Sequence, residues 1–120
     1  MKKILIVDDE PNIVMTLEYT FKKSNYEVFI ARDGQEALDI LKTNFPDVII
    51  LDIMMPMVDG FATLVQIRKD DNLQHTKVMF LSAKNKESDF EKGLALGADA
   101  YMTKPFSIKK VVEKVEELLL

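Results

Sequence analysis

Short apolar runs alternate along the chain with segments of helical periodicity. The apolar runs are rich in valine and isoleucine and recur at Lys3 to Val7, Val28 to Ala31, Val48 to Leu51, Val78 to Leu81 and Ala100 to Thr103. Strand-length runs separated by helical segments predict βαβ units and a parallel sheet. Three of the runs are unbroken apolar stretches, as expected for strands that are covered on both faces.

Five helices are predicted between and after these strands, and several of their ends are marked. Pro11 suits the first turn of a helix, where no N–H is needed. Asp33, with Glu36 three residues later, is typical of a capping box. Gly60 precedes the third helix, and Gly97 is a left-handed residue that ends the fourth. The last helix has an apolar face made of Ile108, Val111, Val112, Val115 and Leu118.

Polar side chains directly follow the apolar runs. Asp8 and Asp9 follow the first run, Asp52 the third, Ser82 the fourth and Lys104 the fifth. The carboxyl ends of parallel strands share one edge, which is where ligands bind in open α/β sheets. The three carboxylates can converge only if the first and third strands are neighbours. This favours a doubly wound, flavodoxin-like sheet of order 2-1-3-4-5.

Composition narrows the class of protein. The 120 residues fit one domain, 1–120, and the mixture of 48% hydrophobic and 30% charged residues is typical of a soluble globular protein. The net charge of −4 argues against direct nucleic acid binding. The absence of cysteine excludes disulfides and thiolate metal sites. No signal peptide or membrane span is evident, so we expect a cytoplasmic protein.

The residues at the sheet edge suggest phosphoryl chemistry. Three clustered carboxylates repel one another unless a cation joins them. Ligands that are all oxygen select a hard ion, which we expect to be Mg²⁺, with Mn²⁺ as the alternative. The Lys104 ammonium and the Ser82 hydroxyl suit charge spread over phosphoryl oxygens. Asp52 stands alone at the end of the central strand and is the best candidate for a nucleophile that forms an aspartyl phosphate.

Four strings, in order and at matching spacing, resemble the receiver domains of two-component response regulators over essentially the whole chain. They are Ile6 to Pro11, Leu51 to Gly60, Leu81 to Lys84 and Gly97 to Phe106. The resemblance implies that a histidine kinase or phosphotransfer protein donates a phosphoryl group to Asp52. It also implies that Lys104 pairs with the phosphoryl oxygens.

The same resemblance assigns the metal ligands. Asp9 and Asp52 would ligate the ion directly, together with the backbone carbonyl of Met54, and Asp8 would act mainly through water. It further implies a cis peptide bond before Pro105.

A switch and its lifetime are also implied. Ser82 would move onto the phosphoryl group, and Tyr101 would turn inward into the space that is vacated, changing the surface of the fourth helix, fifth strand and fifth helix. Met54 and Lys84 occupy the positions that flank the attacking water. The apolar Met54 side chain cannot orient that water, and the long cationic Lys84 side chain can obstruct it. We therefore expect slower self-hydrolysis than in a receiver with Asn and Glu at these positions.

Two other functions remain open at this point. A self-contained Mg²⁺-dependent phosphohydrolase would use the same acidic site, but dehalogenase-type phosphatases need a second Asp where Met54 stands. A degenerate receiver acting as a docking module is the other alternative, and the complete set of site residues argues against it. We therefore expect a signalling phosphoacceptor rather than an enzyme acting on other substrates.

The downstream effector is not named by the sequence. The region around Tyr101 resembles receivers of winged-helix transcription factors, but Ala100, Lys114, Glu116 and Glu117 depart from the residues that pair such dimers. We expect a monomer or a phosphorylation-dependent homodimer. The chain is either a single-domain regulator or a receiver from a longer protein.

Overall fold

One parallel sheet forms the centre of the protein. The computed structural model describes residues 1–120. Its strands are β1 (Lys3–Val7), β2 (Glu27–Ala31), β3 (Val48–Leu51), β4 (Lys77–Ser82) and β5 (Ala100–Thr103). They pair in the order β2-β1-β3-β4-β5, all parallel, which confirms the predicted order.

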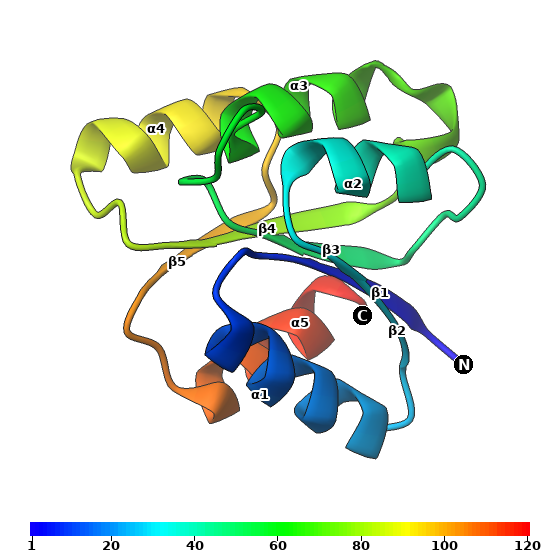
Figure 1. The fold of residues 1–120 in the computed structure, drawn as a ribbon. Helices are drawn as coiled ribbons and strands as arrows, with labels where there is room; N and C mark the ends of the chain where they lie inside the picture. The colour runs from blue at the N-terminus through cyan, green and yellow to red at the C-terminus, as the bar shows by residue number, and fades with distance from the viewer.

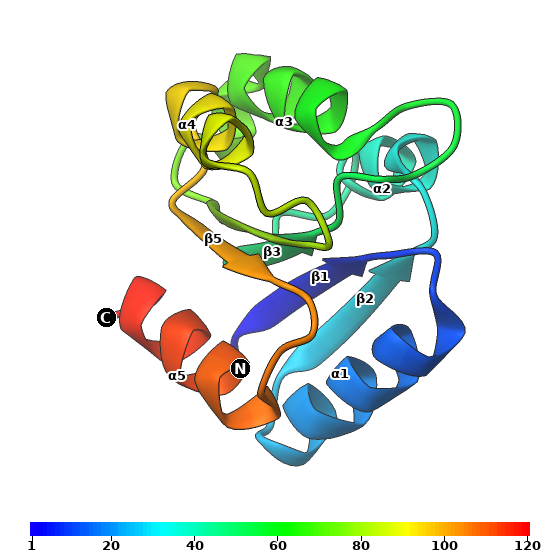
Figure 2. The ribbon, with the colours of Figure 1, turned by 90° about the vertical axis from the view of Figure 1, so that its left-hand side faces the viewer.

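Helices cover both faces of this sheet. They are α1 (Pro11–Lys23), α2 (Gly34–Ile40), α3 (Gly60–Lys69), α4 (Glu87–Ala95) and α5 (Ile108–Leu118), with a short 3-10 helix, η1 (Asp71–Leu73), after α3. Figure 1 shows α1 and α5 on one face and α2, α3 and α4 on the other, and Figure 2 shows the same three layers from the side. None of the helices combines the length and the apolarity that crossing a bilayer requires.

The two faces of the sheet contribute to two separate cores. Within β1, Ile4 and Ile6 belong to the core that contains Phe21 of α1 and Val111 of α5. Their neighbours Leu5 and Val7 belong to the core beneath α2 and α3. Successive side chains of a strand point to opposite faces, and here both faces are buried. This is why the strand sequences read as continuous apolar runs.

The predicted helix ends are present with one change. The Asp33 carboxylate accepts a hydrogen bond from the Glu36 backbone N–H at 2.8 Å. The Glu36 side chain accepts from the backbone N–H of Arg32, one residue before the cap, rather than from Asp33 itself. Gly97 follows α4 with a φ of +107°, in the left-handed region that glycine tolerates.

The register of the strands places the polar residues together. Val7 pairs with Leu51 across β1 and β3, and the backbone N–H of Asp52 donates to the Val7 carbonyl at 2.9 Å. On the other side of the site, the Lys104 N–H donates to the Ser82 carbonyl at 2.9 Å. Asp52 and Lys104, which directly follow β3 and β5, and Ser82, the last residue of β4, are therefore held at the same edge of the sheet.

Candidate functional site

Asp52 lies at the middle of this edge. The residue is only 3% exposed, and its Oδ1 accepts a hydrogen bond from the backbone N–H of Ile53 at 2.8 Å. Gly60 begins α3 directly behind it, and a side chain at this position would collide with the Asp52 carbonyl oxygen. The close approach of α3 therefore requires glycine here, and it fixes the loop that follows Asp52.

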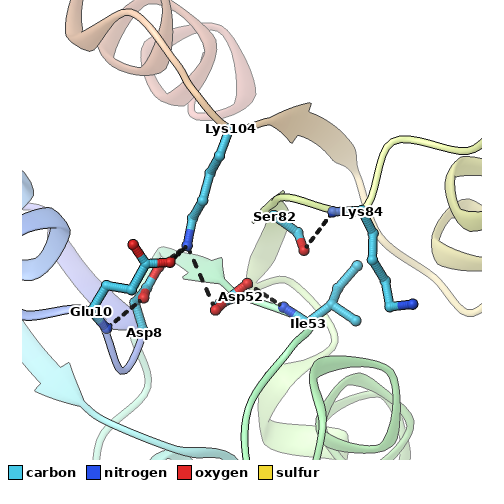
Figure 3. A network of polar contacts seen from close by, with 7 residues as sticks. All are labelled: Asp8, Glu10, Asp52, Ile53, Ser82, Lys84 and Lys104. Carbon is cyan, nitrogen blue, oxygen red and sulfur yellow. Dashed lines mark hydrogen bonds and ion pairs between the residues drawn. The ribbon is translucent and has the colours of Figure 1, made fainter.

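Lys104 joins the carboxylates. Its Nζ lies 2.8 Å from Asp8 Oδ2, 3.0 Å from Glu10 Oε1 and 3.6 Å from Asp52 Oδ2. The side chains of Asp8 and Asp52 are 4% exposed and that of Lys104 is 10% exposed, whereas Glu10 is 57% exposed. Figure 3 shows the ammonium reaching down from β5 into the space between these carboxyl groups. One buried cation thus faces three acidic groups.

This arrangement shifts the acid–base equilibria of the site. Burial and, to a lesser extent, the charge of Asp8 raise the pKa of Asp52, whereas Lys104 and the N–H groups of Ile53 and Met54 lower it, and the net result is a pKa of about 6. Burial alone would lower the pKa of Lys104, but its hydrogen bonds to Asp8 and Glu10 and the charge of Asp52 outweigh burial and raise that pKa. Lys104 is therefore a permanent cation of the site.

Three carboxyl groups could hold a metal ion. Asp8, Glu10 and Asp52 each offer one oxygen, and these oxygens all lie within 4.8 Å of one another. An oxygen-only set of this kind suits a hard divalent cation. The cluster contains Glu10, which the sequence reasoning did not assign to the site, and it does not contain Asp9.

The positions of Asp9 and Glu10 follow from a bend in the backbone after β1. The chain bends at Asp9, whose side chain is exposed, and the side chains of Asp8 and Glu10 both contact the Lys104 ammonium. The Glu10 N–H also donates to Asp8 Oδ1 at 2.9 Å. Asp9 is exposed and lines, with Asp8, a cavity of about 190 Å³. The spacing of two residues from Asp8 was the signal that could have found Glu10.

Ser82 and Tyr101 both hold the loop after β4. Ser82 is fully buried, and its Oγ accepts a hydrogen bond from the Lys84 N–H at 3.3 Å. The Tyr101 hydroxyl donates to the Lys84 carbonyl at 2.8 Å, while its ring packs against Phe80 and Phe90. Figure 3 shows Ser82 and Lys84 on the opposite side of Asp52 from Asp8 and Glu10.

The remaining predicted site residues lie around this centre. Met54 is 58% exposed, two residues beyond Asp52. Lys84 is half-buried. The Lys104–Pro105 peptide bond is cis, as expected.

The fold and the site together define a class of protein. A doubly wound sheet carries an acidic cluster and a buried lysine where the crossovers diverge to opposite faces, which is the ligand-binding position of such sheets. The cluster suits a divalent cation, and the lysine suits an anion such as a phosphoryl group. This is the class of α/β domains that handle phosphoryl groups at a carboxylate edge.

Comparison with known proteins identifies the family. Residues 4–116 match the family model of the response regulator receiver domain. The chain is 46% identical over 118 residues to the alkaline phosphatase synthesis transcriptional regulatory protein PhoP of Bacillus subtilis, covering 98% of this chain and 48% of that protein. The chain therefore belongs to the response regulator receiver domain family and is a signalling domain of two-component systems. It spans about half the length of this curated relative.

Solved structures show the same fold. The chemotaxis protein CheY4 of Vibrio cholerae is 31% identical, with a TM-score of 0.94 and 99% of each chain covered. The response regulator TrrA of Thermotoga maritima, solved in complex with Mg²⁺-BeF, is 37% identical, with a TM-score of 0.87 and coverage of 99% of this chain and 100% of that one. The phosphohydrolase and docking-module alternatives are not favoured by these findings together with the intact acidic cluster.

The raised pKa of Asp52 predicts that the metal-free protein becomes less stable as the pH rises. An acid whose pKa rises on folding stabilises the fold fully below its unfolded pKa of about 4, and this contribution is lost as the pH rises through about 6. In EDTA at pH 7.5, Asp52→Asn should therefore raise the free energy of unfolding by about 1–3 kcal/mol. The gain should shrink towards pH 4.5, as measured by urea denaturation.

An exposed carboxylate provides the control for this prediction. Asp71→Asn removes the same charge from the surface and should leave the pH dependence of stability as it is in the wild type. A stability gain in Asp52→Asn that stays constant from pH 7.5 to pH 4.5 would show that the burial of the charged form is not its cause.

Proposed function

We propose that Asp52 accepts a phosphoryl group from a histidine kinase or a phosphotransfer protein. The observation that carries this proposal is the buried Asp52 carboxyl group at the end of β3, with Lys104 Nζ 3.6 Å from its Oδ2. An Asp52 oxygen attacks phosphorus, the bond between phosphorus and the donor imidazole breaks, and the imidazole nitrogen keeps the electron pair. Lys104 then pairs with the phosphoryl oxygens and balances their charge.

The metal ion of this reaction is proposed to be Mg²⁺, with Mn²⁺ as the alternative. Asp9, Asp52 and the backbone carbonyl of Met54 would hold it, with Asp8 acting mainly through water. The oxygen-only donors fit this assignment, and for Asp9 it requires the exposed carboxylate to turn toward the cluster. When bound, the ion supplies positive charge that offsets the repulsion between the carboxylates and the incoming phosphoryl group.

The output is proposed to be a changed surface. Ser82 moves onto the phosphoryl group, and the loop after β4 follows because Lys84 is bonded to both Ser82 and Tyr101. The surface formed by α4, β5 and α5 then changes its conformation, and a downstream effector recognises the changed surface. We propose that the domain acts in the cytoplasm, as a monomer or as a phosphorylation-dependent homodimer. It does not bind nucleic acid itself. It promotes only its own phosphorylation and dephosphorylation.

Phosphorylation by a small donor tests the acceptor directly. Incubation with acetyl phosphate and Mg²⁺ should add one phosphoryl group, detected by intact mass measurement. The adduct should be absent in Asp52→Asn and after chelation of the metal. Steady release of phosphate from unrelated phosphomonoesters, without an adduct, would instead favour a hydrolase.

Thermal stability tests the metal ligands. Mg²⁺ at ten times its Kd should stabilise the folded state by about 1.4 kcal/mol, which raises the Tm by roughly 4–7 °C in a domain of this size. Asp8→Asn and Asp9→Asn should each blunt this rise. Glu10→Gln is the matched comparison and should keep it. If Mg²⁺ no longer raises the Tm of Glu10→Gln but still raises that of Asp9→Asn, then Glu10 rather than Asp9 is the metal ligand.

The lifetime of the phosphorylated state tests Met54 and Lys84. An apolar side chain beside Asp52 cannot orient water, and a long cationic one obstructs its path. The double variant Met54→Asn with Lys84→Glu should therefore lose its phosphoryl group several-fold faster than the wild type, measured by the decay of the phosphorylated mass. If the half-life is unchanged, neither residue controls the lifetime of the phosphorylated state.

A further inference from the structure

We propose that Glu10 is a positioning residue that holds Lys104 away from Asp52 until a phosphoryl group arrives. The inference rests on the proposed function of Asp52 and adds a restraint to it. In this view the Lys104–Glu10 ion pair is a latch, and its opening is part of the phosphorylation step.

The distances define the closed state of the latch. Lys104 Nζ donates to Asp8 at 2.8 Å and to Glu10 at 3.0 Å. Its distance of 3.6 Å to Asp52 Oδ2 is an ion pair but exceeds a hydrogen bond. Two of the three N–H groups of the ammonium are therefore engaged by carboxylates other than the acceptor. To bond a phosphoryl oxygen on Asp52 closely, the ammonium must move toward Asp52.

Differences in burial decide which of the two bonds opens. The Asp8 side chain is 4% exposed, so losing Lys104 would leave a buried charge without a partner, which is strongly unfavourable. The Glu10 side chain is 57% exposed, so water can hydrate its carboxylate after release. The backbone of Glu10 is fixed, because its carbonyl accepts from the N–H groups of Ile13 and Val14 at the start of α1. Only the side chain of Glu10 is free to swing away.

Substituting Glu10 should have opposite effects on the rate of phosphorylation depending on whether Glu10 is the latch or a metal ligand. Glu10 Oε1 lies near oxygens of Asp8 and Asp52, so it could also ligate a cation. A lost ligand would slow phosphorylation and weaken Mg²⁺ binding. A lost latch would speed phosphorylation, because Lys104 no longer has to leave Glu10 before it reaches the phosphoryl group.

Two substitutions separate contact from charge. Glu10→Gln removes the charge and keeps the length, whereas Glu10→Asp keeps the charge but is too short to reach Lys104 in the same way. We expect both to increase the rate of phosphorylation by acetyl phosphate, at saturating Mg²⁺, by about two- to fivefold, the range that one exposed ion pair allows. The affinity for beryllofluoride, a phosphoryl analogue, should increase by a similar factor. Glu91→Gln, an exposed α4 residue, is the control for net charge.

Nuclear magnetic resonance provides a readout that general effects on structure would not produce. A scalar coupling across the hydrogen bond should connect the Lys104 Nζ with the Glu10 carboxyl carbon in the unphosphorylated wild type, and beryllofluoride should abolish it. The coupling to the Asp8 carboxyl carbon should persist in Glu10→Gln.

The outcomes that overturn the latch are distinct from those that overturn the proposed function. If phosphorylation is faster in Glu10→Gln but not in Glu10→Asp, the effect comes from the charge of Glu10 and not from its contact with Lys104. If phosphorylation is slower in both variants, Glu10 is a metal ligand. Either result rules out the latch. A wild type that accepts phosphoryl groups at the same rate as both variants also removes it and leaves the function of Asp52 standing. A wild type that accepts none overturns the function and the latch together.

Discussion

The ion pair between Lys104 and Asp8 is the interaction on which the edge of the sheet depends. It joins residues at opposite ends of the sequence, at a distance of 2.8 Å and almost out of contact with water. Without this ammonium, the two buried carboxyl groups of Asp8 and Asp52 would face each other with no cationic side chain between them to offset their repulsion. The Lys104 side chain extends from the end of β5 to Asp8 at the end of β1, so the fifth strand completes the site as well as the sheet.

The rest of the domain supplies the rigidity that such a site needs. The residues of β1 from Ile4 to Val7 and all those of β3 are fully or almost fully buried, and helices cover both faces of the sheet (Figure 1). A tightly packed core resists displacement, so the carboxyl groups cannot relieve their repulsion by moving apart. An added cation therefore stabilises the site by reducing this repulsion, and an added anion requires a compensating positive charge.

The sequence predicted the fold because each of its signals was local or periodic. Strand positions, the order 2-1-3-4-5 and the cap at Gly97 followed from apolar runs, from the convergence of carboxylates and from backbone preference. Side-chain contacts across the site were harder, since they depend on how each loop leaves its strand. The exposure of Asp9 and the contact of Glu10 with Lys104 depend on the bend at Asp9, which the types of the neighbouring residues do not reveal.

Other contacts could not be predicted at all. The hydrogen bond from Tyr101 to the Lys84 carbonyl involves a backbone group, which leaves no trace in residue identity. The partial exposure of α4 could not be predicted either. Leu94 is 53% exposed although it occupies an apolar position of the helix. The pattern marks a helix but not how closely the helix is docked, because docking depends on neighbouring elements such as the Phe80 ring beside Gly93.

The two bonds to Lys84 have a consequence for how such domains can diverge. Both use the backbone of this residue, its N–H toward Ser82 and its carbonyl toward Tyr101. The side chain is thus left out of the connection between the site and the surface of α4 and β5. Substitution of the side chain at position 84 leaves both of these hydrogen-bonding groups in place. Under the proposed function, the lifetime of the phosphoryl group and the transmission of the signal can therefore change independently.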